Sequence, residues 1–196
     1  MNFGAVFRPA TREDARKTVE LFAIASSGVA DEYVWGTLAP QYPGLTPLEI
    51  GERRYAREEG AFSYKNCTVA ELGGEVIGML HAFPMEEEPE ETDEPVDPVL
   101  EPYARLEVPG SHYVSAMAVF PGHRGRGLGT RMLEMAKEQA RDRGCRRVSL
   151  LVFERNEGAV ELYRRHGFEV IDRAPVVPHE AILYTGDVLL MTTTVE

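Results

Sequence analysis

The sequence predicts a single α/β domain, built as a sandwich of helices on both faces of a mixed sheet. Its 196 residues, with 43% hydrophobic and 27% charged side chains, are typical of one ordinary globular domain. Segments with strand-like and helix-like patterns follow one another in the order β-α-α-β-β-β-α-β-α-β-β. Residues 147–153 are almost continuously apolar, as expected of a strand covered on both faces. This succession is typical of a sheet sandwiched by helices.

Caps and periodicity justify the elements of the N-terminal half. Thr11 and Asp14 resemble a capping box, and proline is favoured in the first turn of a helix. Alternating, β-rich segments on either side of Gly73-Gly74 predict a hairpin. In order, we expect a strand at 3–8, a helix from Thr11 to near Gly28, a loop at 31–47, a more polar helix from Thr46 or Pro47 to Glu59, and paired strands at 67–72 and 75–83.

One acidic segment carries most of the net charge. The chain has 21 Lys and Arg against 32 Asp and Glu, so its net charge is −11, and nine of the acids lie between Met85 and Glu101. That stretch contains no Lys or Arg, and without its acids the charge would be −11 + 9 = −2. It cannot bury a core, so we expect a loop insertion at 84–110 within a single domain that spans 1–196. The acids either attract a cationic substrate or are simply solvated.

The composition also excludes several classes of protein. An acidic surface argues against nucleic-acid or anionic-membrane partners. Cys67 and Cys145 are too few for a disulfide framework and lack a metal-binding spacing, so no metal is expected. No signal-peptide pattern or apolar run of about 20 residues is present, which predicts a cytoplasmic protein with reduced thiols.

The C-terminal half alternates strands with amphipathic helices. Apolar residues at helical spacing follow a turn that is rich in Gly and Arg, and Gly144 and Gly167 mark helix ends. The expected elements are a strand at 112–119, a turn at 122–129, a helix to near Gly144, a strand at 147–153, a helix at 157–166 and final strands at 168–171 and 187–193.

The most informative stretch is Val114 to Thr130, where a strand runs into a Gly-rich turn that opens a helix. Glycines allow backbone N–H groups to approach a ligand, and a helix N-terminus binds phosphate. Between Phe120 and Leu133 there are three Arg, one His and no acid. A turn of this kind is also a common helix N-cap, and it matches neither a dinucleotide-binding fingerprint nor a P-loop.

Two spaced motifs resemble the Gcn5-related N-acetyltransferase (GNAT) superfamily. The first is Arg124-x-x-Gly127-x-Gly129, and the second is Asn156-x-x-Ala159-x-x-Leu162-Tyr163-x-x-x-Gly167-Phe168. They cover roughly residues 113–170. The resemblance implies a mostly antiparallel central sheet with helices on both faces. It also implies an N-acetyltransferase that uses acetyl-CoA as cosubstrate, and a homodimer is the expectation from the family.

The resemblance also implies roles for particular residues. A backbone N–H near Val119 would face the thioester oxygen, and Tyr163 would protonate the leaving CoA thiolate. Without the motifs, Tyr163 would be interpreted as a core aromatic and Asn156 as a helix N-cap. The residues implied in cofactor binding are Met117, Ala118, Val119, Arg124, Gly125, Arg126, Gly127, Leu128, Gly129, Thr130 and Asn156.

The acceptor and the general base are less well defined. Leu151 stands where ribosomal-protein acetyltransferases of this superfamily carry a Glu that acts as the general base. Candidate substrate-binding residues are Tyr33 and Trp35, in a loop that lines the acceptor site in the family, together with Tyr113 and Ser115, which share strand parity with Met117. We expect direct transfer in a ternary complex to a primary amine of a small molecule. A protein or peptide amine as acceptor, or a non-catalytic acyl-CoA-binding protein, are the alternatives.

Overall fold

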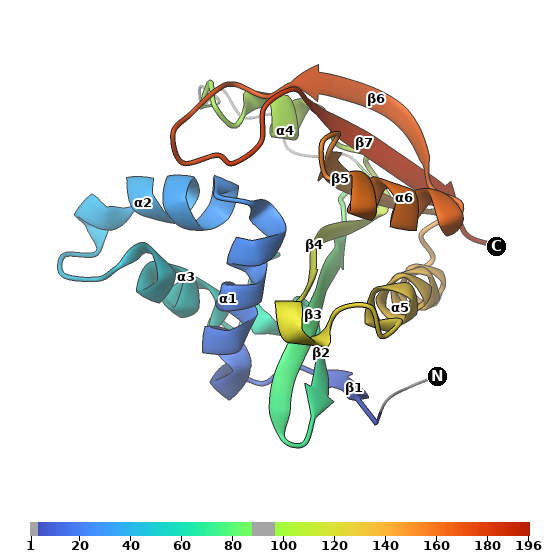
Figure 1. The fold of residues 1–196 in the computed structure, drawn as a ribbon, viewed down its shortest axis with the longest axis horizontal. Coiled ribbons are helices and arrows are strands. Elements are labelled where there is room, and N and C mark those ends of the chain that lie inside the picture. Colours follow the sequence, from blue (N-terminus) through green and yellow to red (C-terminus); the bar gives the residue numbers. More distant parts are fainter. Residues whose placement is uncertain (1–3, 88–96) are drawn as a thin grey trace. The chain divides into compact units, whose positions relative to one another are not determined.

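The computed structural model describes residues 4–87 and 97–196, and it is a mixed α/β structure (Figure 1). Seven strands form one sheet in the order β1-β2-β3-β4-β5-β7-β6. The pairs β1–β2, β2–β3, β5–β7 and β6–β7 are antiparallel, and β4–β5 is parallel. The predicted mixed, mostly antiparallel sheet is therefore confirmed. Among the described residues, no helix has the length and apolar character needed to cross a membrane.

The observed elements follow the expected order, with additional short helices. The strands are β1 (Val6–Pro9), β2 (Cys67–Leu72), β3 (Glu75–Pro84), β4 (His112–Val119), β5 (Arg147–Phe153), β6 (Glu169–Pro175) and β7 (Asp187–Thr194). The α-helices are α1 (Ala15–Ser26), α2 (Trp35–Thr37), α3 (Pro47–Tyr55), α4 (Glu101–Arg105), α5 (Leu128–Asp142) and α6 (Glu157–Arg165). Short 3₁₀ turns cover Arg12–Asp14, Ala39–Gln41, Tyr64–Asn66 and Pro121–His123, and Val29–Val34 is a π-helical turn.

The chain forms two compact units. The N-terminal unit comprises Met1–Ala82, Ala116–Met132 and Ala181–Leu183, and the C-terminal unit comprises Phe83–Ser115, Leu133–Glu180 and Tyr184–Glu196. Strands β3 and β4 and helix α5 contribute residues to both units. The single domain over 1–196 stays a prediction.

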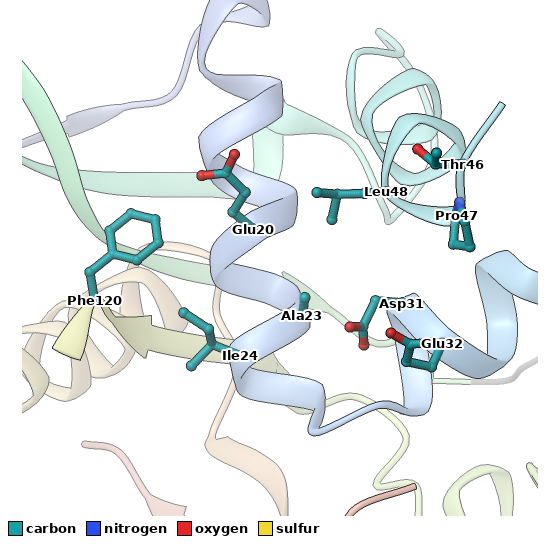
Figure 2. Close-up of a pocket in the computed structure, with 9 residues that line it drawn as sticks. All are labelled: Glu20, Ala23, Ile24, Asp31, Glu32, Thr46, Pro47, Leu48 and Phe120. Atoms are coloured by element: carbon teal, nitrogen blue, oxygen red, sulfur yellow. The ribbon is translucent and has the colours of Figure 1, made fainter. Parts of the chain in front are cut away.

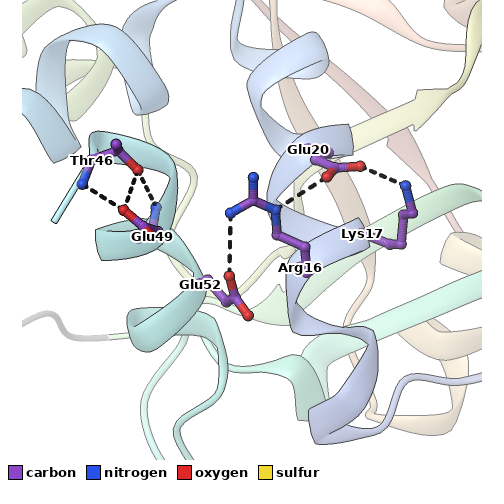
Figure 3. A network of polar contacts seen from close by, with 6 residues as sticks. All are labelled: Arg16, Lys17, Glu20, Thr46, Glu49 and Glu52. Carbon is purple, nitrogen blue, oxygen red and sulfur yellow. Dashed lines mark hydrogen bonds and ion pairs between the residues drawn. The ribbon is translucent and has the colours of Figure 1, made fainter.

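The capping box predicted at Thr11 and Asp14 is present, with the Thr11 amide donating to the Asp14 carboxylate at 2.8 Å, and a second capping box starts helix α3. Thr46 and Glu49 form a capping box in which the Glu49 carboxylate accepts from the Thr46 amide at 2.8 Å and from its hydroxyl at 2.6 Å (Figure 3). Helix α3 then ends at Tyr55, whereas the sequence predicted Glu59. The chain turns back there because the Ser63 hydroxyl donates to the Arg57 carbonyl at 2.6 Å. This hydrogen bond fixes the polar residues after Ala56 in a turn rather than in a helix.

The hairpin predicted around Gly73-Gly74 is confirmed. Strands β2 and β3 pair from Cys67 opposite His81 to Leu72 opposite Glu75. The register shifts between Ala70 and Glu71, which is a β-bulge that increases the local twist.

The core of the N-terminal unit is aromatic. Phe22 of α1 packs against Trp35 and Tyr55, with ring centroids 6.3 and 5.2 Å apart. Gly51 of α3 allows close approach of Trp35, because a Cβ there would lie 2.7 Å from the indole ring. The stretch 31–47, predicted as a loop, contains short helical turns, since its apolar side chains pack on this core.

Strands dominate the C-terminal unit. The apolar strand β5 pairs with β4 on one side and with β7 on the other, and its consecutive residues Val148, Ser149 and Leu150 are all buried. Both faces of the strand are therefore covered, which explains its lack of alternation. The base of the predicted insertion is closed by backbone hydrogen bonds, from Met85 N to Ser111 O at 2.8 Å and from Gly110 N to Glu86 O at 3.2 Å. Helix α4 lies inside the segment predicted as a loop. Most of the acidic run, residues 88–96, lies outside the described residues.

Candidate functional site

Strand β4 presents one half-exposed face along its whole length. Its even-numbered residues are buried, whereas Tyr113, Ser115, Met117 and Val119 are intermediate in exposure. The shared parity of these four residues, which the sequence predicted, is therefore observed. An extended ligand beside this strand would meet those side chains and the backbone between them.

The Gly-rich turn after β4 is exposed and strongly bent. Gly125 and Gly127 have φ values of +74° and +78°, a conformation that L side chains rarely adopt. A Cβ at either glycine would meet no atom within 4 Å, so this side of the turn is open. The backbone can therefore be approached closely by a ligand.

Helix α5 begins directly after the turn and offers free amide groups. Its first turn is closed by the hydrogen bond from Arg131 N to Gly127 O at 3.1 Å. The amides of Leu128, Gly129 and Thr130 precede this bond, so helix geometry supplies no acceptor for them within α5. Such amides and the positive end of the helix dipole attract anions.

Basic side chains stabilise the shape of the turn. The Arg124 Nε donates to Val119 O at 3.0 Å, and the guanidinium of Arg126 donates to Gly122 O at 3.3 Å. Two positive charges are thereby held on the turn without a carboxylate in either hydrogen bond. The arrangement suits a phosphate or diphosphate group.

The second motif forms the start and the end of helix α6. Asn156 is the N-cap, and its side-chain oxygen accepts from Ala159 N at 3.4 Å. Tyr163 is 8% exposed and packs beside Phe168 with ring centroids 5.9 Å apart. Burial raises the pKa of Tyr163 to about 12. The phenol therefore keeps its proton at neutral pH, which a general acid requires.

The predicted cofactor residues are distributed over the two units. The strand end Met117–Val119 and the turn Arg124–Thr130 lie together in the N-terminal unit, whereas Asn156 and Tyr163 lie together in the C-terminal unit. The first motif thus forms a turn and a helix start, and the second forms the start and the end of a helix.

The four predicted substrate-binding residues differ in their surroundings. The ring of Tyr113 meets Phe83 edge-on at 5.7 Å, and burial, with the charge of Glu107, raises the pKa of Tyr113. Ser115 is half-buried on the same face of β4. Tyr33 is half-buried, and its amide donates to Gly28 O at 3.0 Å. Trp35 is 3% exposed, so its observed contacts are those of a core side chain.

A pocket of about 500 Å³ opens within the N-terminal unit beside α1 (Figure 2). Apolar groups of Ile24, Leu48 and Phe120 line it, and carboxylates stand on its walls. Phe120 is the residue that follows Val119, so the pocket reaches the end of strand β4. The full lining is Glu20, Ala23, Ile24, Asp31, Glu32, Thr46, Pro47, Leu48 and Phe120.

The carboxylates of the pocket are not equivalent. Glu20 is already paired with Lys17 at 2.9 Å and with Arg16 at 3.2 Å (Figure 3). Asp31 accepts a neutral hydrogen bond, from the Ser26 hydroxyl at 3.3 Å. Asp31 and Glu32 lie together in Figure 2, away from Phe120. The pocket therefore combines an apolar wall with negative charge at one end.

Sequence reasoning missed these pocket residues. From the sequence we singled out Tyr33, Trp35 and the acids after Met85, but not the adjacent pair Asp31-Glu32. Two consecutive acids beside a loop aromatic were an available signal. Their convergence with Phe120, almost ninety residues later in the chain, was not visible in the sequence.

Comparisons with known proteins agree with this geometry. The sequence model of the Acetyltransferase (GNAT) family matches residues 32–168. An uncharacterized N-acetyltransferase of Methanocaldococcus jannaschii is 51% identical over 51 residues, which are 26% of this chain and 23% of that protein. The thialysine N-epsilon-acetyltransferase of Bos taurus is 32% identical over 62 residues, which are 32% of this chain and 36% of that protein. The matches thus span about a quarter to a third of these relatives.

A solved structure extends the likeness to the whole fold. The polyamine N-acetyltransferase of Drosophila melanogaster, described as catalysing the formation of N-acetylagmatine, superimposes with a TM-score of 0.61 at 16% identity. The alignment covers 97% of this chain and 100% of that one. Since the family match includes both motifs and well over half of the sequence, the chain belongs to the GNAT acetyltransferase family.

Proposed function

We propose that the protein transfers an acetyl group from acetyl-CoA to a primary amine of a small cationic molecule, by direct attack in a ternary complex. The observation that carries the proposal is the open, basic turn at the N-terminus of α5, which offers backbone amides to a diphosphate. The match to the acetyltransferase family supports the diphosphate of CoA as the group that binds there.

The cofactor would lie against both the turn and strand β4. We propose that the amides between Arg124 and Thr130 bind the diphosphate, while the half-exposed face that carries Met117 and Val119 receives the pantetheine arm. A backbone N–H near Val119 would donate to the thioester oxygen and stabilise the oxyanion of the tetrahedral intermediate. Asn156 would add a contact to the cofactor while it caps α6.

Tyr163 is proposed as the general acid. When the C–S bond breaks, the phenol would give its proton to the CoA thiolate. Two observations support this role. Burial keeps the phenol protonated, and among the described residues no hydrogen bond engages its hydroxyl. The proton is therefore available for transfer.

The pocket supports an aliphatic cationic acceptor. Its apolar wall suits an alkyl chain, and Asp31 and Glu32 would bind a positive group at one end. The names of the relatives, with thialysine, polyamine and agmatine chemistry, are consistent with such a molecule. Carboxylates near the reacting amine would raise its pKa and delay its deprotonation, so we place them at a second, non-reacting cation. Tyr33, Tyr113 and Ser115 stay proposed acceptor contacts.

Release of free thiol from acetyl-CoA, measured across a panel of amines, tests the proposal. Diamines should be better substrates than monoamines of equal length, and D31N with E32Q should reduce that preference about tenfold or more through KM, consistent with a loss of about 1.4 kcal/mol. E75Q removes an exposed acid outside the pocket and should leave the preference unchanged. Y163F should lower kcat by about 10²-fold or more.

Other outcomes would redirect the assignment. Acetylation of a peptide, with all small amines inert, would indicate a protein-directed enzyme. Tight CoA binding by calorimetry without turnover of any amine would indicate an acyl-CoA-binding protein. The homodimer and the cytoplasmic location inferred from the sequence stay predictions.

A further inference from the structure

Lys137 of helix α5 is used in an unusual way for a lysine. Its side chain is half-buried, and its Nζ donates to the carbonyl of His166 at 2.6 Å. Within residues 4–87 and 97–196, no carboxylate lies within ion-pair distance of this ammonium. Desolvation by burial lowers the pKa of Lys137, and the charge of Arg141 adds to that effect, while the charge of Glu134 opposes it. The hydrogen bond to the His166 carbonyl therefore compensates for part of the water that this ammonium loses.

The carbonyl that Lys137 binds lies at the C-terminus of α6, the helix that carries Tyr163. The last carbonyls of a helix have no intrahelical donor and need other partners. Here the carbonyls of Leu162, Tyr163, Arg164 and His166 each receive one, and the Lys137 ammonium also opposes the negative end of the helix dipole. The pairs are His166 Nδ1 to Leu162 O at 2.8 Å, Phe168 N to Tyr163 O at 3.1 Å, Gly167 N to Arg164 O at 3.0 Å and Lys137 Nζ to His166 O at 2.6 Å.

The same ammonium also contacts the aromatic neighbour of Tyr163. Its Nζ lies 5.7 Å from the centroid of the Phe168 ring, within the range of a cation–π interaction. Phe168 is 2% exposed, and its ring lies 5.9 Å from that of Tyr163. Lys137 thus holds the backbone after Tyr163 and the ring beside it from one point on α5.

We propose that Lys137 is a positioning residue that fixes Tyr163 in the orientation needed for proton transfer to the leaving thiolate, through the His166 carbonyl and the Phe168 ring. This inference rests on the proposed role of Tyr163. Lys137 itself touches neither the cofactor nor the acceptor in the proposal. Its ammonium acts through geometry, because a general acid displaced by about 1 Å loses about 10²-fold in rate.

The test combines three single variants with a double-mutant cycle. K137M keeps an unbranched side chain that is one atom shorter and removes both the donor and the charge, whereas K137R keeps both. R165M removes a cation from the last turn of α6, where Arg165 makes a long ion pair of 4.0 Å with Glu161. We expect K137M to lower kcat about 10- to 100-fold with the KM for acetyl-CoA within about twofold, and K137R and R165M to stay within about threefold of the wild type.

The Y163F background separates positioning from a general structural role. If Lys137 acts through Tyr163, K137M should change kcat less than about twofold in Y163F, because the group it positions is already absent. Equal losses in the two backgrounds would overturn the inference and leave the role of Tyr163 intact. Full activity of Y163F would instead overturn the proposed general acid, and the inference with it.

A spectroscopic measurement tests the positioning without turnover. In protein labelled with 3-fluorotyrosine, the ¹⁹F resonance of Tyr163 is assigned by its loss in Y163F. We expect K137M to shift or broaden this resonance, and K137R and R165M to leave it in place. An unchanged Tyr163 resonance in K137M would refute the inference even if the protein acetylates none of the amines tested.

Discussion

Replacement of Gly51 by alanine tests how tightly Trp35 is held in the core. Gly51 lies in helix α3, outside the positive-φ region, so alanine meets no backbone strain there. The added Cβ, however, would lie 2.7 Å from Cε3 and Cζ3 and 2.8 Å from Cδ2 of the Trp35 indole. Carbon atoms in contact normally sit about 3.5–4.0 Å apart. The indole or the helix must therefore move by close to 1 Å.

The sign of the effect follows from two opposing contributions. Alanine stabilises a helix interior by about 1 kcal/mol relative to glycine. Overpacking of a filled core costs about 1–3 kcal/mol, and Trp35 has little room to yield because Phe22 and Tyr55 pack on it at 6.3 and 6.4 Å. This rigid packing places the cost in the upper part of its range, at about 2–3 kcal/mol. After the helix gain of about 1 kcal/mol, we expect a net loss of about 1–2 kcal/mol, which corresponds to a fall in Tm of about 2–8 °C for a chain of this size.

Gly158 provides the matched control. It also lies in a helix without a positive φ, but a Cβ there would meet no atom within 4 Å. G158A should therefore raise the free energy of unfolding by up to about 1 kcal/mol. Urea denaturation, followed by the fluorescence of the single tryptophan, measures both variants. A G51A protein as stable as G158A would refute the rigid placement of Trp35 and reopen its assignment as a surface contact for the acceptor.

Three further predictions concern the turn, a buried imidazole and the thiols. G127A should weaken CoA binding by calorimetry about tenfold or more and destabilise the fold by about 1–2 kcal/mol, because a Cβ is strained at its φ of +78° and occupies the open face of the turn. Burial lowers the pKa of His81 to about 4, below its unfolded value of 6.5, so its neutral form is favoured by folding. The free energy of unfolding should therefore fall by up to about 3 kcal/mol as pH drops from 6.5 to 4, measured by urea titrations at several pH values. Burial raises the pKa of the Cys67 thiol, so a thiol reagent should modify only the half-exposed Cys145 in the native protein.

Each of these predictions has its own control. G122A, at an exposed glycine without positive φ, should not destabilise the fold. H81F should reduce the acid sensitivity and leave the part due to His112, whose pKa burial also lowers to about 4. C145S should abolish the reaction with the thiol reagent until the protein is unfolded. An acid sensitivity that is the same in H81F and wild type would contradict the assignment to His81.

Much of the fold was predictable because its signals are local. The Thr11–Asp14 capping box, the Gly73-Gly74 turn and the apolar strand 147–153 each act within a few residues, and each appears as expected. Helix ends were predicted less well. The end of α3 at Tyr55 depends on the hydrogen bond from Ser63 to Arg57, which joins residues outside the helix pattern.

The site shows the same division. The order and spacing of the two motifs sufficed to propose a diphosphate-binding turn and a tyrosine that acts as general acid. Both depend on short segments whose backbone conformation is set by glycines and helix starts. The pocket beside Phe120 could not be predicted, since residues from α1, α3 and the end of β4 meet only when the chain packs.

The sequence by itself therefore determined the family, the succession of strands and helices, and the open Gly-rich turn, because these depend on motif spacing, periodicity, capping and positive-φ glycines within short windows. Only the tertiary structure decided that Trp35 lies in the core, that Asp31 and Glu32 line a partly apolar pocket, and that Lys137 binds the C-terminal end of the helix that carries Tyr163. These three outcomes depend on burial and on contacts between residues far apart in the chain. Local sequence does not encode them, because a contact of that kind is fixed by the packing of whole elements rather than by the preferences of any one segment.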